Sequence, residues 1–282
     1  MKKDLILVVG ASGTVGTELI NQLKQQGHQT RATTSQKVQN SQELMHINLA
    51  TGEGIKDAFE GVDKAFFLSP PGYADQYALL SPLIKEAKRR GLKKVVLMTA
   101  MGANANDSTP FRRAEIELEK SGLNFNIIRP NWFFQNFSSF WIQGINEQNK
   151  ILLPAGKAKV SFIDARDISA VAAKLLTSDA FDRKDFDLTG PEAVDHNQVA
   201  EAISKVSDRK VEYQEIKPEE LKQGLLKAGA PEDYANFLVM IFGFLREGYS
   251  ERLTSSVKDI TGLEPRALSK YSNDYKNSWI NK

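Results

Sequence analysis

LILVVGASGTVGTELINQL, from Leu5 to Leu23, is the stretch of this 282-residue chain that decides its fold. It opens with a continuous apolar run to Val9, rich in branched residues, which is typical of a strand buried on both faces of a parallel sheet. From Thr14 the apolar residues recur at helical spacing on one face. The stretch therefore predicts a strand, a glycine turn and a helix, which is the order that holds the phosphates of a dinucleotide.

Three glycines occupy this turn, Gly10, Gly13 and Gly16, in the pattern G-x-x-G-x-x-G. The first permits the tight turn, the second lets the backbone approach a pyrophosphate, and the third lets the helix pack closely on the strand. The alternative is a turn whose glycines serve packing only, with Ser12 and Thr14 capping the helix. That alternative does not account for three glycines, so we predict a bound dinucleotide.

Composition indicates a globular α/β protein. With 41% hydrophobic residues, the chain can bury a large core as one domain or as one domain with a smaller lobe. Lys and Arg number 37 against 35 Asp and Glu, without a long basic block, so no nucleic acid is expected as a partner. The absence of cysteine excludes disulfides and thiolate chemistry. His28, His46 and His196 are scattered, so we expect them at surface or loop positions and expect no metal site.

The apolar runs are too short for membrane insertion or secretion. The first run ends at Gly10 without a cleavage site, so no secretion signal is expected. The longest, Phe237 to Leu245, is far too short to cross a bilayer and suits a buried or lid helix. These features predict a cytoplasmic protein that does not associate with membranes.

Strand and helix patterns alternate through the first half of the chain. Further strands are predicted at Gln29–Thr34, Leu44–Ile47, Lys64–Leu68, Lys94–Met98 and Phe125–Ile128. Helices are predicted at Asp75–Arg90, closed by Gly91, and at Thr109–Ser121, and the first helix ends before Gly27. This order predicts an α/β fold of the Rossmann type, a doubly wound parallel sheet with its ligand outside the carboxyl ends of the strands.

Beyond Pro130 the alternation weakens. Aromatic residues crowd between positions 132 and 141, and a loop follows at Leu153–Gly156, so we expect this region to wall the substrate pocket. Strands are predicted at Val160–Ile163 and Phe186–Leu188, around a helix at Asp167–Leu176 whose N-cap is Asp167 and in which Arg166 forms an ion pair. The predicted Rossmann domain comprises residues 1–130 and about 157–190. Residues 131–156 and 191–282 are assigned to a smaller, mostly helical substrate lobe that contains Tyr234 to Phe244.

Several separate motifs give the chain a family resemblance. They are VVGASGTVG at the start, GVDKAFFLSPPG at 61–72, VVLMTAMGA at 95–103, IIRPNWFFQNF at 127–137, FIDARDIS at 162–169 and DLTGPEA at 187–193. The sequence resembles the atypical short-chain dehydrogenases of the NmrA-like group, and within it the NAD(P)H-dependent quinone oxidoreductases and azoreductase-like proteins. The resemblance covers nearly the whole chain. It implies a Rossmann core, a nicotinamide cofactor and an acceptor bound between two lobes.

The end of the second predicted strand bears on which nicotinamide cofactor binds. An NAD-selective site normally has a carboxylate there, whereas residues 31–37 read RATTSQK. The hydroxyls of Thr34 and Ser35, with the charges of Arg31 and Lys37, favour the 2′-phosphate of NADPH. Arg31 and Lys37 as ordinary solvated charges are the alternative, and many relatives have an arginine where Ser35 stands. We therefore predict NADPH and keep NADH as the alternative.

The acid of ordinary short-chain dehydrogenases is missing. Those enzymes use Tyr-x-x-x-Lys on the helix after the fifth strand, where this chain has Phe111-Arg112-Arg113-Ala114-Glu115. The one match to that spacing, Tyr213 to Lys217, precedes Pro218 in the late lobe, and we interpret it as coincidental. Hydride transfer to an unactivated ketone leaves a basic alkoxide that needs a proton donor, whereas a quinone leaves a delocalised anion. The sequence therefore favours an electron-poor acceptor that is held in contact with the cofactor.

The predicted site residues fall into three groups. Polar groups that could stabilise developing charge are Thr99, Asn131 and Asn136, although the asparagines could equally cap the loop after Pro130 and Thr99 could orient the nicotinamide ribose. The predicted cofactor-binding residues are Gly10, Ser12, Gly13, Thr14, Val15, Gly16, Arg31, Thr34, Ser35, Lys37, Leu68, Ser69, Pro70 and Thr99. The predicted floor of the acceptor pocket is Met101, Trp132, Phe133 and Phe134, with plain core packing as the alternative.

The sequence is compatible with two functions. The first is an NAD(P)H-dependent oxidoreductase whose acceptor is a small molecule such as a quinone. The second is a redox sensor that binds the dinucleotide without turnover and acts through a protein partner, as some NmrA-like proteins do. The apolar stretch around Phe237 to Leu245 could serve such a partner, a homodimer or the core.

Overall fold

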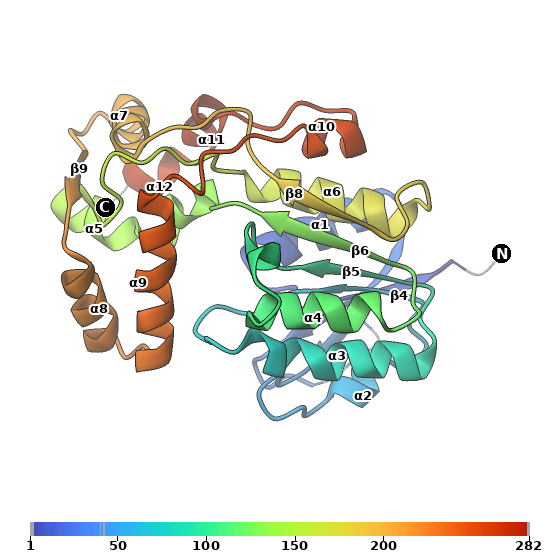
Figure 1. Ribbon diagram of the computed structural model, residues 1–282. Coiled ribbons are helices and arrows are strands. Elements are labelled where there is room, and N and C mark those ends of the chain that lie inside the picture. The colour runs from blue at the N-terminus through green and yellow to red at the C-terminus, as the bar shows by residue number, and fades with distance from the viewer. Residues whose placement is uncertain (1–2, 40, 42, 281–282) are drawn as a thin grey trace.

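The computed structural model describes residues 3–39, 41 and 43–280. A seven-stranded, all-parallel sheet forms its centre in the order β3-β2-β1-β4-β5-β6-β8 (Figure 1). Its strands are β1 (Leu5–Val8), β2 (Gln29–Thr34), β3 (Leu44–His46), β4 (Lys64–Phe67), β5 (Lys94–Met98), β6 (Phe125–Pro130) and β8 (Lys184–Leu188). The predicted doubly wound Rossmann-type sheet is confirmed.

Helices cover both faces of this sheet. One face packs against α1 (Thr14–Gln25) and α6 (Ala165–Thr177), and the other against α2 (Ile55–Ala58), α3 (Gln76–Arg90) and α4 (Pro110–Glu119). The strands are buried on both faces because their side chains alternate between these two cores: Ile6 and Val8 face α1 and α6, whereas Leu7 faces α3 and α4.

The helix ends follow the capping residues in the sequence. Asp75 caps α3 by accepting from the Ala78 backbone amide, and Gly91 ends that helix in the left-handed conformation. Thr109 caps α4, whose first residue is Pro110. The predicted N-cap of α6 is wrong by three residues, because the capping carboxylate belongs to Asp164.

A second lobe, to the left in Figure 1, packs around its own aromatic core. It contains a two-stranded parallel sheet of β7 (Lys150–Leu153) and β9 (Glu212–Glu215), neither of which was expected. The predicted strand at 160–163 is wrong, since only isolated bridges form there. The surrounding helices are η2 (Phe134–Ser138), α5 (Ile142–Gln148), α7 (His196–Ser207), α8 (Pro218–Lys227), α9 (Glu232–Arg246), α11 (Leu268–Asp274) and α12 (Asn277–Ile280).

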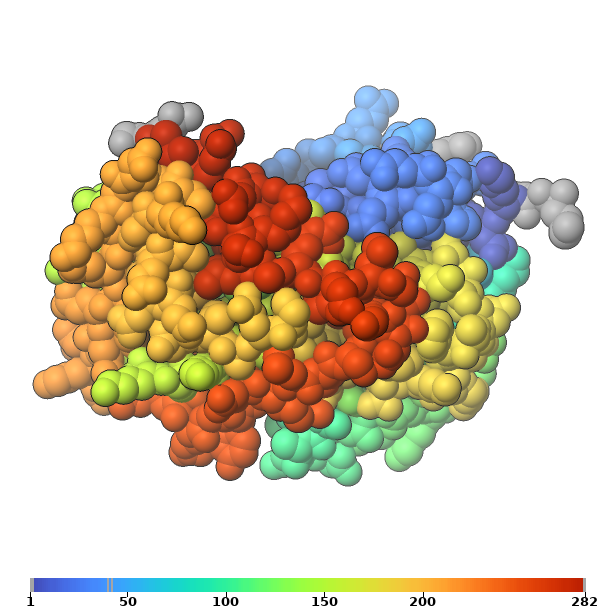
Figure 2. Space-filling view, turned by 90° about the horizontal axis from the view of Figure 1, so that it is seen from above, coloured from blue at the N-terminus to red at the C-terminus, as the bar shows by residue number. Residues whose placement is uncertain are grey.

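The segment from Glu247 to Ile280 runs over both parts of the molecule, as the red surface in Figure 2 shows. Its first helix, α10 (Ser256–Thr261), inserts Val257 and Ile260 into the core shared by α1, α6 and the sheet. Its last helices insert Tyr271 and Trp279 into the aromatic core of the second lobe. The assignment of residues 191–282 to the second lobe therefore needs correction at α10. The other domain boundaries stay predictions.

No helix within the described ranges combines the length and the apolar character that a bilayer crossing requires.

Candidate functional site

The candidate site lies where the order of the sheet reverses, between the carboxyl ends of β1 and β4. The chain leaves β1 toward β2 on one side, and β4 lies on the other side, which is the arrangement in which doubly wound folds have a ligand-binding crevice between diverging loops. The glycine turn after β1, the loop after β4 and the short 3-10 helix η1 (Ala103–Ala105) beyond β5 all lie at this edge. The topology therefore brings most of the predicted site residues to one edge of the sheet.

The three glycines of the turn have distinct steric roles. Gly10 has a φ of +73° and lies against Leu68, whose Cδ1 would be 2.7 Å from an added Cβ. A Cβ on Gly16 would lie 2.2 Å from the Gly10 carbonyl oxygen, so only glycine lets α1 approach the turn this closely. A Cβ on Gly13 would lie 3.3 Å from the same oxygen, and Gly13 itself is exposed. The predicted roles of Gly10 and Gly16 are confirmed.

The N-terminus of α1 is open to solvent. Ser12, Gly13 and Thr14 are exposed, and none of the described side chains caps the helix. Val15 instead points into the core between α1 and α6. The Gly13 amide donates to the Gly10 carbonyl within the turn. The uncapped helix N-terminus beyond it fits a diphosphate, because helix amides and the helix dipole both favour negative charge. The predicted phosphate contacts at this turn stay predictions.

The loop after β4 forms the opposite wall of the crevice. Leu68, Ser69 and Pro70 are half-buried there, and Leu68 packs on the glycine turn. The same loop comes close to the second lobe, where the backbone of Gly72 faces Tyr234 of α9. Burial raises the pKa of Tyr234, and the nearby backbone of Gly72 opposes that rise. The loop thus links the crevice to the second lobe.

Arg31 is not available to a 2′-phosphate, and its predicted cofactor role is corrected. It lies within β2, is 8% exposed, and its Nη1 donates to the carbonyl oxygens of Ala58 and Glu60 at 2.9 and 2.6 Å. These carbonyls lie at the end of α2, where a cation is favourable. At the end of β2, Thr34 accepts from the Gln36 backbone amide, and Ser35 and Lys37 are exposed.

Thr99 follows β5 and belongs to a buried ionic network on the α4 side of the sheet. Its hydroxyl donates to Oε1 of Glu115 at 2.6 Å. Arg129 grips the same carboxylate with two parallel bonds, Nε to Oε1 and Nη2 to Oε2, both 2.8 Å. Arg112 adds a third cationic contact, from Nη1 to Oε2 at 3.0 Å. The predicted role of Thr99 as a donor to developing charge is therefore corrected, since its one proton is already used.

The charges of this network stabilise one another. Burial lowers the pKa of Arg129, but its hydrogen bonds to Glu115 and Asp185 outweigh burial and raise the pKa above the usual value. Hydrogen bonding to Glu119 is the main cause that raises the pKa of Arg112. Glu115 is fully buried, and its four donors offset the cost of removing a carboxylate from water.

The two asparagines have different environments. Asn131 is 5% exposed, and its Nδ2 donates to the Ser161 hydroxyl at 2.7 Å and to the Ser250 carbonyl at 2.8 Å. Its Oδ1 accepts from the Trp132 amide. Both polar atoms of its side chain are thus engaged within the protein, so its predicted catalytic role is corrected to a structural one. Asn136 is half-buried in η2, and its catalytic role stays a prediction.

The predicted aromatic floor is divided between three environments. Phe134 is fully buried between Phe162 and Tyr271, so its pocket role is corrected to core packing. Phe133 packs against the core between the sheet and α6. Trp132 is half-buried against Phe242 of α9, with ring centroids 4.9 Å apart. Met101 is half-buried after β5, and the pocket role of Met101 and Trp132 stays a prediction.

His196 corrects the expectation of a surface or loop position. It is the first residue of α7, fully buried, and surrounded by the rings of Phe137, Phe162, Trp141 and Tyr213. Burial lowers its pKa to about 4, and the charge of Asp195 opposes this shift. Among the described residues, no three His, Cys, Asp or Glu side chains gather as a metal site would need.

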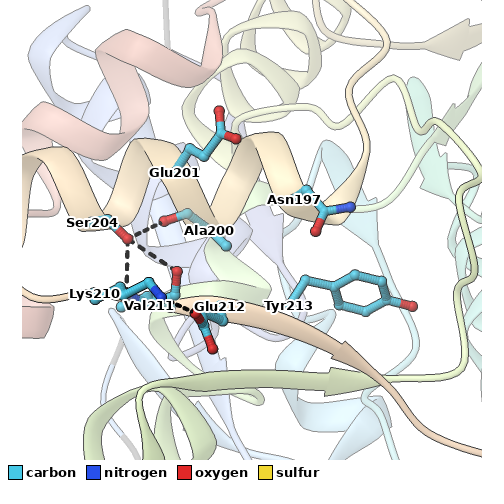
Figure 3. A pocket seen from close by; sticks show the side chains of 8 residues that line it. All are labelled: Asn197, Ala200, Glu201, Ser204, Lys210, Val211, Glu212 and Tyr213. Atoms are coloured by element: carbon cyan, nitrogen blue, oxygen red, sulfur yellow. Dashed lines mark hydrogen bonds and ion pairs between the residues drawn. The ribbon is translucent and has the colours of Figure 1, made fainter.

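A hollow of about 540 Å³ lies between α7 and β9 (Figure 3). Its lining includes Glu201, Lys210, Glu212 and Tyr213, and none of the predicted site residues borders it. The Tyr213 hydroxyl donates a hydrogen bond to the Leu153 carbonyl and accepts one from the Ala155 backbone amide. This hollow belongs to the second lobe and not to the crevice between β1 and β4.

Sequence reasoning missed three residues that shape the site. Arg129 stands within the apolar strand IIRP, where a charge must have a buried partner. Glu115 lies on the buried side of α4 next to Ala114, which is the corresponding signal on that helix. The contact between Tyr234 and Gly72 joins distant segments, and no local pattern predicts it.

Comparison with known proteins shows the family to which the chain belongs. The sequence matches the NmrA-like family over residues 2–275. It is 31% identical to the uncharacterized oxidoreductase YesF of Bacillus subtilis, over 99% of this chain and 98% of that protein, and 30% identical to the NAD(P)H azoreductase of Xenophilus azovorans, over 95% and 96%. The Escherichia coli NADPH-dependent quinone oxidoreductase QOR2, solved with NADPH, superposes with a TM-score of 0.77 at 21% identity, covering 95% of this chain and 99% of that one. With a family match over nearly its whole length, the chain belongs to the NmrA-like family.

Proposed function

We propose that this protein is an NADPH-dependent oxidoreductase that transfers hydride to a quinone or a similar electron-poor small molecule. Its relatives named for an oxidoreductase and an NAD(P)H azoreductase support the reaction class. The structural neighbour that was solved with NADPH is named an NADPH-dependent quinone oxidoreductase, which supports a quinone as the acceptor. NADH remains the alternative reductant.

The observation that carries the proposal is the open N-terminus of α1 beneath the turn at Gly10. Ser12, Gly13 and Thr14 are exposed at the point where the sheet order reverses, which is where doubly wound folds bind dinucleotides, and the Gly13 amide is the one of the three that donates within the turn, to the Gly10 carbonyl. Gly16 brings the helix against the turn, so that the helix end faces the crevice. These residues fit the diphosphate of a dinucleotide.

Each wall of the crevice has a proposed task. The turn and α1 would hold the diphosphate, Ser35 and Lys37 the 2′-phosphate, and the loop at Leu68 the nicotinamide half. The bound dinucleotide supplies the hydride. Met101 and Trp132 are half-buried beyond β5 and β6, and we assign them to the acceptor.

The residues around the crevice suit an acceptor that needs no strong acid. Phe111 and Glu115 stand where ordinary short-chain dehydrogenases have tyrosine and lysine. Phe111 packs against the core under α4, and Glu115 accepts hydrogen bonds from Arg129. An acceptor whose reduced form delocalises its charge can be reduced by positioning alone.

The test is oxidation of NADPH by the purified protein with a panel of quinones, azo dyes and activated alkenes. Turnover with a quinone well above the rate without protein supports the proposal. Tight binding of NADPH without turnover of any acceptor, together with co-purification of a specific protein, contradicts it and favours the redox sensor.

Cofactor preference has its own test. Lys37→Ala is expected to weaken NADPH about tenfold while leaving NADH unchanged, because it removes a charge-assisted contact to the 2′-phosphate. Lys227→Ala, on the exposed side of α8, is the matched control and should change neither affinity. Equal effects on both nucleotides would contradict a 2′-phosphate site at Lys37.

A further inference from the structure

Glu115 is a buried carboxylate whose role the proposed function leaves open. It is fully buried beneath α4 and reaches the carboxyl end of β5, where it accepts the Thr99 proton. Thr99 lies beside Arg129, because the preceding residues Met98 and Ile128 pair in adjacent strands. The carboxylate, the threonine hydroxyl and the guanidinium therefore share one face of the sheet at the edge of the crevice.

The position of this carboxylate is fixed from several sides. Arg129 holds both oxygens in a bidentate pair, and Arg112 holds Oε2 from within the same helix. Arg129 is held in turn by Asp185 on β8. A bidentate pair of this kind restricts rotation of both side chains, so Oε1 stays directed at Thr99.

The consequence falls on the Thr99 hydroxyl. A threonine hydroxyl has one proton to donate and two lone pairs to accept with. The hydroxyl donates its proton to Oε1 of Glu115 at 2.6 Å, and the Thr99 backbone amide donates to the Ile128 carbonyl. What Thr99 can offer a ligand is therefore acceptor capacity alone.

We propose that Glu115 is a positioning residue that makes Thr99 an acceptor-only contact for the nicotinamide half of the cofactor. The partner would be a donor group of that half, either a ribose hydroxyl or the carboxamide N–H. The inference rests on the proposed function, since it assumes a bound dinucleotide.

The topology places that half of the cofactor near Thr99. In a doubly wound sheet one mononucleotide half lies over the strands on each side of the reversal. Here β1 and β2 carry the phosphate turn and Ser35, so the other half lies toward β4 and β5. A lysine at position 115 would donate hydrogen bonds, whereas Glu115 accepts them, which sets the direction of the Thr99 bond.

The experiment measures binding rather than turnover. Dissociation constants are determined by calorimetry for NADPH and for 2′,5′-ADP, which lacks the nicotinamide half. Thr99→Val keeps the shape and removes the hydroxyl, and it should weaken NADPH about tenfold with no change for 2′,5′-ADP. Thr99→Ser, which restores the hydroxyl, should return NADPH affinity to within about threefold of the wild type.

Glu115→Gln tests whether Glu115 acts through Thr99. It should weaken NADPH several-fold in the wild-type background and less than about twofold in the Thr99→Val background, because the contact is then already absent. A full effect of Glu115→Gln in both backgrounds would overturn the inference. Thermal melting checks that each variant is folded, and if Glu115→Gln is not, Glu115→Asp takes its place in the same two backgrounds with the same expected outcomes.

The outcomes separate this inference from the proposed function. Wild-type protein that does not bind NADPH would overturn both. Wild-type binding that Thr99→Val leaves unchanged, or a loss of affinity that is equal for NADPH and 2′,5′-ADP, would overturn the role of Thr99 and Glu115 alone.

Discussion

Gly16 has a hydrogen atom in place of a side chain, and this sets the distance between α1 and the turn that precedes it. At Gly16 an added Cβ would meet the Gly10 carbonyl oxygen at 2.2 Å and the Ala11 Cα at 2.7 Å. Both neighbours are backbone atoms, so neither can move aside by changing a rotamer. Any side chain here must push the helix away from the strand.

Gly16→Ala should therefore lower the free energy of unfolding by about 3 kcal/mol, at the upper end of overpacking effects, as measured by urea denaturation. Gly224→Ala is the matched control, because that helical glycine of α8 has no heavy atom within 4 Å of an added Cβ. The control should gain about 0.5–1 kcal/mol from helix propensity. Similar changes for the two variants would contradict the steric explanation.

His196 places a titratable ring in an aromatic core. Neither ring nitrogen has a described hydrogen-bond partner, and burial holds its pKa at about 4. Because the folded pKa lies below the unfolded value, the unfolded chain binds the proton more readily. The contribution to stability is thus complete above about pH 6.5 and is lost as the pH falls toward 4.

As the pH falls across that window, the wild type should lose about 3 kcal/mol of unfolding free energy relative to His196→Phe. The loss should not exceed about 1.4 kcal/mol per pH unit. Phenylalanine fits the surrounding rings and cannot be protonated, so the variant should lack this part of the pH dependence. Urea denaturation at a series of pH values measures it. Parallel curves for the two proteins would show that His196 does not titrate in this way.

The roles of single residues were predictable from the sequence where they depend on contacts with residues nearby in the chain. The turn at Gly10 and Gly16 was predictable because its sterics involve neighbours along the chain. Arg31 and Asn131 were misassigned because their partners, such as Ala58 and Ser250, are remote in sequence. A polar side chain beside a crevice looks the same in sequence whether it points in or out.

The N-cap of α6, Asp164, also takes part in contacts outside its own helix. Oδ1 of Asp164 accepts from the Arg166 amide and from the Gln135 side chain, both at 2.9 Å, and Oδ2 accepts from the Arg166 guanidinium at 2.6 Å. Gln135 lies in η2, and Arg166 also reaches Asp274 of α11. One buried carboxylate therefore joins a helix of the sheet core to two segments of the second lobe.

Asp164→Ala should cost about 3–5 kcal/mol in a denaturation experiment, because it removes a cap and leaves Arg166 and Gln135 without their buried partner. The control is Asp195→Ala, which removes the same residue type from the N-cap of α7, where the capping box is exposed. That change should cost about 1 kcal/mol. Equal costs would mean that the network around Asp164 adds nothing to the cap.

Elements were predictable in proportion to how local their signals were. The helices with Asp75 and Thr109 caps and the buried strands of the central sheet follow from nearby residues. β7 and β9 did not, because they are four residues long, one of them reads EYQE, and each is defined by pairing with the other. The motifs at 160–163 are apolar enough for a strand but form only single bridges.

At the scale of the whole molecule, the segment from Glu247 to Ile280 ties the two cores together. Besides its buried side chains, Arg252 pairs with Asp187 of β8 and Arg266 pairs with Asp167 of α6. Neither core is complete without this segment. We therefore expect the lobes to unfold together.

Unfolding should appear as one transition whether followed by tryptophan fluorescence or by far-UV circular dichroism. The fluorescence reports the second lobe, because Trp132, Trp141 and Trp279 all pack there, whereas the dichroism reports the whole chain. Val257→Ala, on the sheet side, should lower both midpoints equally, at a cost of about 2 kcal/mol. Two separate midpoints, or a shift in one signal alone, would show that the lobes are independent.

The same segment has a consequence for synthesis on the ribosome. Tyr271 and Trp279 complete the aromatic core around Phe137, and they emerge from the exit tunnel after all the other fully buried residues of that core. Until they do, the nascent polypeptide exposes hydrophobic aromatic side chains that a chaperone would bind. A premature stop codon upstream of Tyr271 would leave these side chains exposed and yield a product that aggregates.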